Sequence, residues 1–495
     1  MGVIKRQGIL NTIISYAGIL IGYVNTVLLF PNLLDPDEIG LVRILVTISL
    51  MYAQFSALGF GNMSLRFFPH FRDKARQHHG FLFLLLSVPL AGFAVITILF
   101  IVARPRVLQY YADSSPLLVE YYYYLIPLGL FTLLFVLLDA YLRSLYKTVV
   151  SAFLQEFFLR LLVSVSITAY ALGGLDFRAF VVLYVGIYCL NALILVGYLI
   201  WLKQFFVLPN RQTFSRKPLG EMFQYGFFSF LGNISTSIIT TLDSLMILSF
   251  LGLAEVGIYT TAFYITTAIL VPAKSLYRVA YAQVVDFWKA NDLPALSSLY
   301  QRISLLNMMV GGLLFIGIWA NRHNIFNLMP EDFRAGNYVL LFIGLARLID
   351  IAVGINAILL VTSPKYRYDL IFNLILVGLI IVTNYVFIPR FGISGAAFAS
   401  LLAYVLSNLL RLGFVWRAFG LQPFTSRSLL VLGIGGFTLA VGTFIPYFGT
   451  TVLDIIGRSA IITVVYGVLI LLLGVSEDAD QAYQYLFRLF FRKRK

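Results

Sequence analysis

The 495-residue sequence predicts an all-α protein that crosses a membrane about 14 times. Composition is the first observation: 60% of the residues are hydrophobic, only 12% are charged, and the mean hydropathy is +0.89. The second is a set of twelve uncharged runs of at least 18 residues, each long enough to cross a hydrocarbon core of roughly 30 Å as a helix. Such runs are too long for barrel strands of about ten alternating residues, so we expect a helical bundle.

The predicted spans follow one another along the whole chain. The twelve uncharged runs begin near Gln7, Ile44, Gly80, Tyr121, Ala179, Met222, Val256, Ile303, Leu370, Phe391, Ser428 and Ser459. Two further apolar stretches, Val149–Leu172 and Ala335–Val361, are each interrupted by a pair of charged residues, and counting both gives 14 spans. The first run follows Lys5-Arg6 as in a signal peptide, but no small-residue cleavage site follows it, which favours a permanent span.

A duplication, the third observation, divides twelve of these spans into two sets of six. Leu34–Leu41 is echoed 217 residues later by Leu251–Ile258, and Glu38-Ile39-Gly40 matches Glu255-Val256-Gly257. Two weaker echoes keep this offset to within one residue: Leu138-Asp139-Ala140 with Ile355-Asn356-Ala357, and Gly174, Ala179 and Phe180 with Gly392, Ala397 and Phe398. Three echoes in one order indicate a duplicated unit. Because each copy holds an even number of spans, we expect the copies to lie parallel around a pseudo-twofold axis.

The spans and the repeat predict five segments. Residues 1–202 form a first lobe of six helices, 203–221 a basic cytoplasmic linker, and 222–416 a second lobe of six helices. Residues 417–476 hold two appended helices, whose spans at about 428–475 are expected to contain no internal charge. Residues 477–495 form a basic amphipathic tail on the cytoplasmic membrane surface. With both termini in the cytoplasm, most of the 36 Lys and Arg residues fall on the cytoplasmic side, as the positive-inside rule requires.

The net charge of +14 is explained by this topology and by anionic lipid head groups. Nucleic-acid binding is not expected, because no predicted soluble segment is long enough to carry it. An enzyme is not expected either: the loops are short, no Gly-rich phosphate loop occurs, and the four histidines match no catalytic spacing. His78-His79 could form a metal pair, but polar residues of a basic loop are the favoured interpretation, so we expect no metal and no cofactor.

Charged residues inside the predicted spans are the candidate substrate ligands. Glu156 and Arg160 are spaced i,i+4, Arg347 and Asp350 are spaced i,i+3, and Asp243 lies in the outer half of the seventh span. A charge at the centre of a membrane helix costs about 2.5–3.5 kcal/mol even on the lenient insertion scale. Two interpretations stay open. Each pair either neutralises itself and packs helices together, or its arginine lines a central cavity and binds an anion while the acid balances charge or carries a proton.

A second basic group marks the predicted cytoplasmic mouth of such a cavity. It comprises Arg66, Arg143, Lys147, Lys274 and Arg278. The positive-inside rule alone explains basic residues at this level. The alternative is that they collect an anionic head group as it arrives.

Loose motifs recur in order and spacing over about residues 5–415. They are Leu34-Asp35-Pro36-Asp37-Glu38-Ile39-Gly40, Leu58-Gly59-Phe60, Arg66-Phe67-Phe68-Pro69, Asp243, Glu255-Val256-Gly257-Ile258-Tyr259 and the segment Ile388–Ala397. This ordered set resembles the multidrug/oligosaccharidyl-lipid/polysaccharide (MOP) exporter superfamily, and in particular its polysaccharide biosynthesis branch of O-antigen (Wzx-type) flippases.

The resemblance implies V-shaped lobes around a basic central cavity, with two extra helices. It implies alternating-access movement of an undecaprenyl-diphosphate-linked oligosaccharide from the cytoplasmic to the periplasmic leaflet of a bacterial inner membrane. The transported lipid would supply assembly of surface polysaccharide, either the O-antigen of lipopolysaccharide or exopolysaccharide. The implied partners are this substrate, membrane lipids and polysaccharide polymerase machinery, and the coupling ion, Na⁺ or H⁺, stays open. Arg160 and Arg347 suit the diphosphate by depth, although neither falls on a motif of the family.

Other members and other classes are distinguished by particular residues. The lipid II flippase branch keeps an arginine and an acid in its first span, whereas Asn11–Phe30 has no charge, which disfavours that branch. A cation-coupled multidrug exporter stays an alternative, because Glu156 is a deep acid in the first lobe. A membrane polymerase or glycosyltransferase is a third reading, and the short external loops weigh against it.

Overall fold

The structure is a computed structural model that describes residues 2–209 and 219–478. Within these residues every regular element is helical, and 13 helices are long and apolar enough to cross a membrane. The longest, α19 (Arg367–Phe419), contains the predicted eleventh and twelfth spans, which are separated at Gly392 by a non-helical φ of 58°. A positive φ is open to glycine at little cost, so Gly392 allows the chain to break between two passes. The predicted all-α protein of about 14 spans is therefore confirmed.

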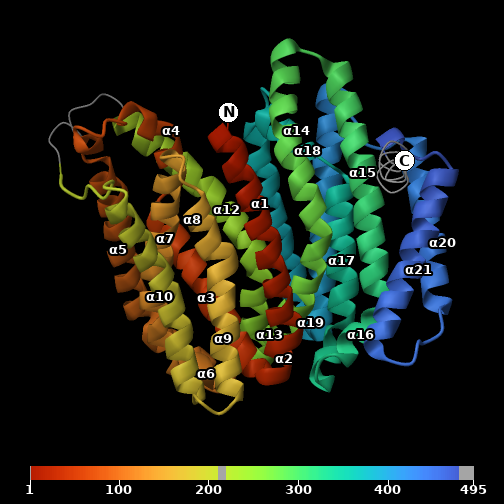
Figure 1. Ribbon diagram of the computed structural model, residues 1–495, viewed down its shortest axis with the longest axis horizontal. Helices are drawn as coiled ribbons and strands as arrows, with labels where there is room; N and C mark the ends of the chain where they lie inside the picture. Colours follow the sequence, from red (N-terminus) through yellow and green to blue (C-terminus); the bar gives the residue numbers. More distant parts are fainter. Residues whose placement is uncertain (1, 210–218, 479–495) are drawn as a thin grey trace, which may run out of the picture. The chain divides into compact units, whose positions relative to one another are not determined.

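Residues 1–260 form one compact unit (Figure 1). Its membrane-length segments are α1 (Gly2–Tyr23) with η1 (Val24–Leu29) and α2 (Phe30–Leu33), α3 (Pro36–Ala57), α5 (Phe81–Tyr111), α7 (Leu125–Ser144), α8 (Val149–Ala152) with η5 (Phe153–Phe158) and α9 (Leu159–Ala171), α10 (Phe177–Trp201), α12 (Leu219–Leu251) and most of α13 (Leu253–Thr266). Short helices lie between them: α4 (Phe60–Phe67), η2 (Phe68–His70), η3 (Gln77–Gly80), α6 (Pro116–Glu120) and η4 (Tyr122–Tyr124).

Two glycines of the duplicated motif pack the repeats against each other inside this unit. A Cβ added to Gly40 of α3 would lie 1.9 Å from the carbonyl oxygen of Leu253, and one added to Gly257 of α13 would lie 2.2 Å from that of Pro36. Pro36 and Leu253 are themselves equivalent positions of the repeat. The contact is therefore reciprocal, as across a twofold axis, and only glycine allows the two helix N-termini to approach this closely.

Residues 261–495 form the second compact unit, described here to residue 478. Its further elements are η6 (Thr267–Ile269), α14 (Leu270–Ala290), α15 (Leu293–Ala320), α16 (Arg322–Asn327), η7 (Glu331–Gly336), α17 (Asn337–Ala352), α18 (Asn356–Thr362), α20 (Ser426–Phe444) and α21 (Thr451–Leu472). The predicted tenth span is broken into α17 and α18 by a turn at Gly354, whose φ is 72°. Helices α20 and α21 lie side by side and pack on α15 (Figure 1).

The expectation that the two appended helices contain no internal charge is wrong. Helix α21 begins at Thr451 and includes Asp454 and Arg458, both buried and 3.0 Å apart. Arg458 also donates to the carbonyl of Gly442 at 2.7 Å, and Asp454 accepts from Asn324 of α16. The charges are tolerated because each neutralises the other and the hydrogen bonds around them are satisfied.

The predicted lobe, linker and tail boundaries stay predictions. Most of the linker, residues 210–218, and the tail from residue 479 onward lie outside the described residues.

Candidate functional site

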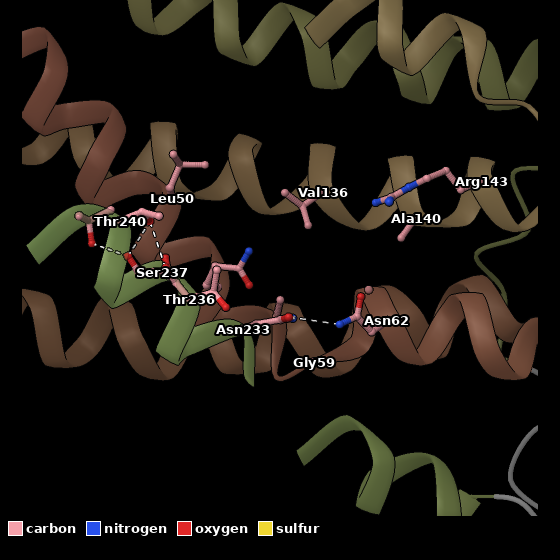
Figure 2. Close-up of a pocket in the computed structure, with 14 residues that line it drawn as sticks. Leu50, Gly59, Asn62, Val136, Ala140, Arg143, Asn233, Thr236, Ser237 and Thr240 are labelled. Atoms are coloured by element: carbon pink, nitrogen blue, oxygen red, sulfur yellow. Dashed lines mark hydrogen bonds between the residues drawn. The ribbon is translucent and has the colours of Figure 1, made fainter. Parts of the chain in front are cut away.

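A pocket of about 400 Å³ lies within the first unit, among α3, α4, α7 and α12 (Figure 2). This volume falls in the range of roughly 300–1,000 Å³ that is typical of small-molecule sites. The lining residues are Leu50, Gln54, Ala57, Gly59, Gly61, Asn62, Val136, Ala140, Arg143, Asn233, Thr236, Ser237, Thr240 and Thr241.

One wall of the pocket is a polar stripe on α12. It consists of Asn233, Thr236, Ser237, Thr240 and Thr241, spaced i, i+3, i+4, i+7 and i+8, and such positions share one helix face. The stripe was missed in the sequence because its residues carry no charge and fall inside the uncharged run that begins at Met222. The signal was nevertheless present, since amides and hydroxyls at helical spacing give an otherwise apolar span one polar face.

Several polar groups of the pocket can form further hydrogen bonds. The amide of Asn62 donates to the side-chain oxygen of Asn233 at 3.2 Å, as the dashed line in Figure 2 shows. The hydroxyls of Thr236 and Thr240 donate to backbone carbonyls one turn earlier, at 3.1 and 3.2 Å. Within the described part of the chain, the Ser237 hydroxyl and the Gln54 amide have no hydrogen-bond partner.

Arg143 brings the only charge among the residues that line the pocket. Its guanidinium lies 2.8 Å from Asp139 one turn earlier on α7, and 47% of its side chain is exposed. Figure 2 shows Arg143 and Asn62 at one end of the pocket and Leu50 and Thr240 at the other. Of the ten predicted site residues, Arg143 alone is in this lining.

The chemistry of the lining separates ligand classes. The lining residues include no carboxylate and no aromatic ring, the two groups that hold organic cations in protein sites. They offer amides, hydroxyls and one guanidinium, which match uncharged hydroxyl groups beside an anionic group.

The structure brings Glu156 and Arg160 together, as their spacing predicts. The guanidinium Nη2 of Arg160 lies 2.8 Å from Glu156 Oε2, and both side chains are partly exposed. The second terminal nitrogen, Nη1, is buried without a hydrogen-bond partner among the described residues. Asn25 of η1 donates to the Arg160 backbone carbonyl at 2.9 Å and so fixes this turn of η5 and α9 against the first membrane segment.

A further arginine, Arg43, lies near this pair and was not among the predicted ligands. It donates to the hydroxyl of Thr26 at 2.9 Å and lies over the ring of Phe30 at 5.0 Å. Thr26 follows Asn25, which bonds to the backbone of Arg160, so η1 contacts both arginines. The sequence signal was a charged residue at the edge of the predicted span that begins near Ile44, a weaker form of the signal that singled out Arg160.

In the second unit, Arg347 and Asp350 have different partners. Arg347 donates to the Tyr404 hydroxyl at 3.4 Å and lies 4.8 Å from the centre of the Phe263 ring. Asp350 accepts from the amide of Asn408 at 3.2 Å. Both residues are half-buried.

The remaining predicted residues are divided between the units. In the first, Asp243 is buried and accepts from the Tyr259 hydroxyl at 2.8 Å, and Arg66 stacks on the Tyr225 ring at 4.5 Å. Lys147 is exposed there, one turn beyond Arg143. In the second unit, Lys274 and Arg278 are exposed on α14, four residues and therefore one turn apart.

Comparison with known sequences identifies the family. Residues 4–281, more than half of the 495, match the family described as polysaccharide biosynthesis protein. An uncharacterized membrane protein of Methanocaldococcus jannaschii is 24% identical over 290 residues, which make up 54% of this chain. The match spans only 57% of that relative's length.

Solved structures with similar folds are membrane transporters. The lipid II flippase MurJ, in an inward closed conformation, matches with a TM-score of 0.71 and 16% identity, covering 93% of this chain and 98% of that one. An inward-facing multidrug resistance MATE family transporter of the MOP superfamily matches with a TM-score of 0.57 and 15% identity, covering 88% and 98%. The MATE transporter VcmN of Vibrio cholerae matches with a TM-score of 0.54 and 11% identity, covering 85% and 98%.

At these identities the structures show a shared fold, that of polytopic transporters, and the sequence match shows the family. The predicted resemblance is confirmed: this multi-pass membrane protein belongs to the polysaccharide biosynthesis protein family and has the fold of the MOP exporter superfamily.

Proposed function

We propose that this protein is a flippase that moves an undecaprenyl-diphosphate-linked oligosaccharide across a bacterial inner membrane, from the cytoplasmic to the periplasmic leaflet. Its family acts in polysaccharide biosynthesis, and a MurJ-like fold supports transport of a lipid-linked substrate. Both termini lie in the cytoplasm in this proposal, and the product supplies surface polysaccharide assembly.

The observation that carries the proposal is the lining of the pocket. A lipid-linked oligosaccharide presents hydroxyls and a diphosphate, and the lining offers amides, hydroxyls and the guanidinium of Arg143. A multidrug exporter instead holds organic cations with aromatic or acidic side chains, and none of the lining residues is aromatic or acidic.

The deep arginines supply the anion-binding role in this proposal. Arg160 has a buried Nη1 without a partner among the described residues, and leaving a charged donor unsatisfied is costly unless a ligand accepts from it. A diphosphate oxygen is a suitable acceptor, because guanidinium and phosphate form strong charge-assisted hydrogen bonds. Arg347, placed by its two aromatic neighbours, has the same proposed role in the second unit.

The test is a flipping assay in proteoliposomes that contain a fluorescent undecaprenyl-diphosphate-linked N-acetylglucosamine. Dithionite, which does not cross the bilayer, quenches about half of the probe in protein-free vesicles and nearly all of it when a flippase is present. The assay is run with Na⁺ gradients, with H⁺ gradients and without either. We expect flipping by the wild type and its loss in Arg160→Ala and Arg347→Ala.

Arg334→Ala is the matched control, because the side chain of Arg334 is exposed and pairs with the exposed Glu331. Equal flipping by all three variants would overturn the role of the deep arginines. Extrusion of an organic dye by the wild type, with no flipping of the lipid under any gradient, would replace the proposal with the drug-exporter alternative.

A further inference from the structure

We infer that the polar stripe of α12, together with Gln54 and Asn62, is a sugar-recognition subsite that binds the uncharged hydroxyls of the head group. This inference rests on the proposed function and deepens it. It separates sugar recognition, on this stripe, from diphosphate binding by arginines.

The subsite leaves both hydrogen-bond donors and hydrogen-bond acceptors open for a ligand. The amide nitrogen of Asn233, the hydroxyl of Ser237 and the amide of Gln54 can donate, and the side-chain oxygen of Asn62 can accept. A sugar hydroxyl both donates and accepts, so an array of neutral groups with both capacities fits it. A bare diphosphate only accepts and would leave the acceptors of this array unpaired.

The hydroxyls of the stripe are held in place by hydrogen bonds to their own helix. Thr236, Thr240 and Thr241 each donate to a carbonyl one turn earlier, at 3.1, 3.2 and 2.8 Å. These bonds hold the hydroxyl oxygens in fixed positions on a regular helix, with lone pairs still free to accept. A preorganised array of this kind discriminates ligands better than a mobile loop would.

The stripe is long enough to contact more than one hydroxyl group. From Asn233 to Thr240 the helix rises about 10 Å, because each residue adds about 1.5 Å. The stripe therefore contacts several hydroxyls in a row rather than one polar group. Since the lining residues include no aromatic ring for stacking, recognition falls to these hydrogen bonds. Sites built on hydrogen bonds strongly reject ligands that lack the matching groups.

The test measures binding to the full chain in lipid nanodiscs. The probes are undecaprenyl diphosphate and the same lipid linked to N-acetylglucosamine, glucose or galactose. For each protein, the sugar preference is the Kd for undecaprenyl diphosphate divided by the lowest Kd among the three sugar-linked lipids. We expect a sugar preference of at least tenfold in the wild type.

The variants are Ser237→Ala and Thr240→Val, with Ser235→Ala as the control. Loss of one neutral hydrogen bond lowers affinity about fivefold, so we expect each stripe variant to reduce the sugar preference by about that factor. The Kd for undecaprenyl diphosphate should stay unchanged, which also shows that the variants are folded. Ser235 lies on the same helix, is buried and bonds to Leu231, but does not line the pocket, so Ser235→Ala should keep the full preference.

The outcomes separate the two proposals. Failure of every probe to bind the wild type would overturn the proposed function and this inference together. Equal binding of all four lipids by the wild type would overturn the inference alone. So would a sugar preference that survives both stripe substitutions.

Discussion

Replacing Gly40 with alanine should destabilise the first unit through the reciprocal crossing of α3 and α13. The added Cβ would lie 1.9 Å from the Leu253 carbonyl oxygen, whereas ordinary contact begins at 3.4 Å. Because the obstacle is backbone at a helix N-terminus, the two helices must separate by about 1.5 Å, the difference between these distances. Overpacking of this kind costs about 1–3 kcal/mol.

The assay is the apparent melting temperature of the purified protein in detergent, followed by fluorescence-detected size exclusion. Gly257→Ala should produce a similar loss, because its Cβ would meet the Pro36 carbonyl at 2.2 Å across the same crossing. The double variant should lose less than the sum of the two, since one separation accommodates both methyl groups.

Gly186→Ala is the matched control for these two variants. Gly186 lies within α10 of the same unit, and a Cβ there would lie within 4 Å of no described atom beyond its chain neighbours and the backbone of its own helix. Alanine should therefore leave stability unchanged or raise it slightly, because alanine favours a helix more than glycine does. If Gly40→Ala and Gly257→Ala both melt where Gly186→Ala melts, the reciprocal packing of the repeat is wrong.

Two further predictions concern the second unit. Arg458→Met should lower the melting temperature far more than Arg334→Met. Loss of one partner from a buried ion pair costs about 3–5 kcal/mol, whereas an exposed pair contributes little. Equal melting temperatures of the two variants would contradict this. His323 of α16 should titrate below pH 6.5, because partial desolvation and the nearby charges of Arg322, Arg458 and Arg334 lower the pKa of its imidazole. Ring signals of labelled histidine, with His323→Gln for assignment, would refute this if the midpoint lies at or above 6.5.

Apolar run length was sufficient to predict the number of spans, because a bilayer sets the minimum length of every crossing helix. Breaks within spans were harder to predict from the sequence. The turn at Gly354 interrupts the predicted tenth span without changing its hydropathy, since a glycine with positive φ needs no polar residue beside it. Helix α14 likewise continues beyond the apolar run to Ala290, with Lys274 and Arg278 exposed and Ala280 and Val284 buried.

The candidate site was only partly predictable from the sequence, because charge was the feature that distinguished site residues from the apolar residues of the spans. That signal identified Glu156 and Arg160, which the structure pairs, and Arg143, which lines the pocket. It did not reveal the stripe of α12, whose amides and hydroxyls count as uncharged residues in a hydropathy window. Nor did it indicate that Arg347 and Asp350 would have separate partners, which depends on Tyr404 and Asn408 some 50 or more residues away in the chain.

The central claim, that this chain flips a diphosphate-linked sugar lipid, is tested most directly by the dithionite assay on the reconstituted wild type. The account predicts that nearly all of the fluorescent undecaprenyl-diphosphate-linked N-acetylglucosamine becomes accessible in protein-containing vesicles under at least one ion condition, and that Arg160→Ala returns accessibility to about half. Protection of half of the probe in wild-type vesicles under every ion condition would contradict it.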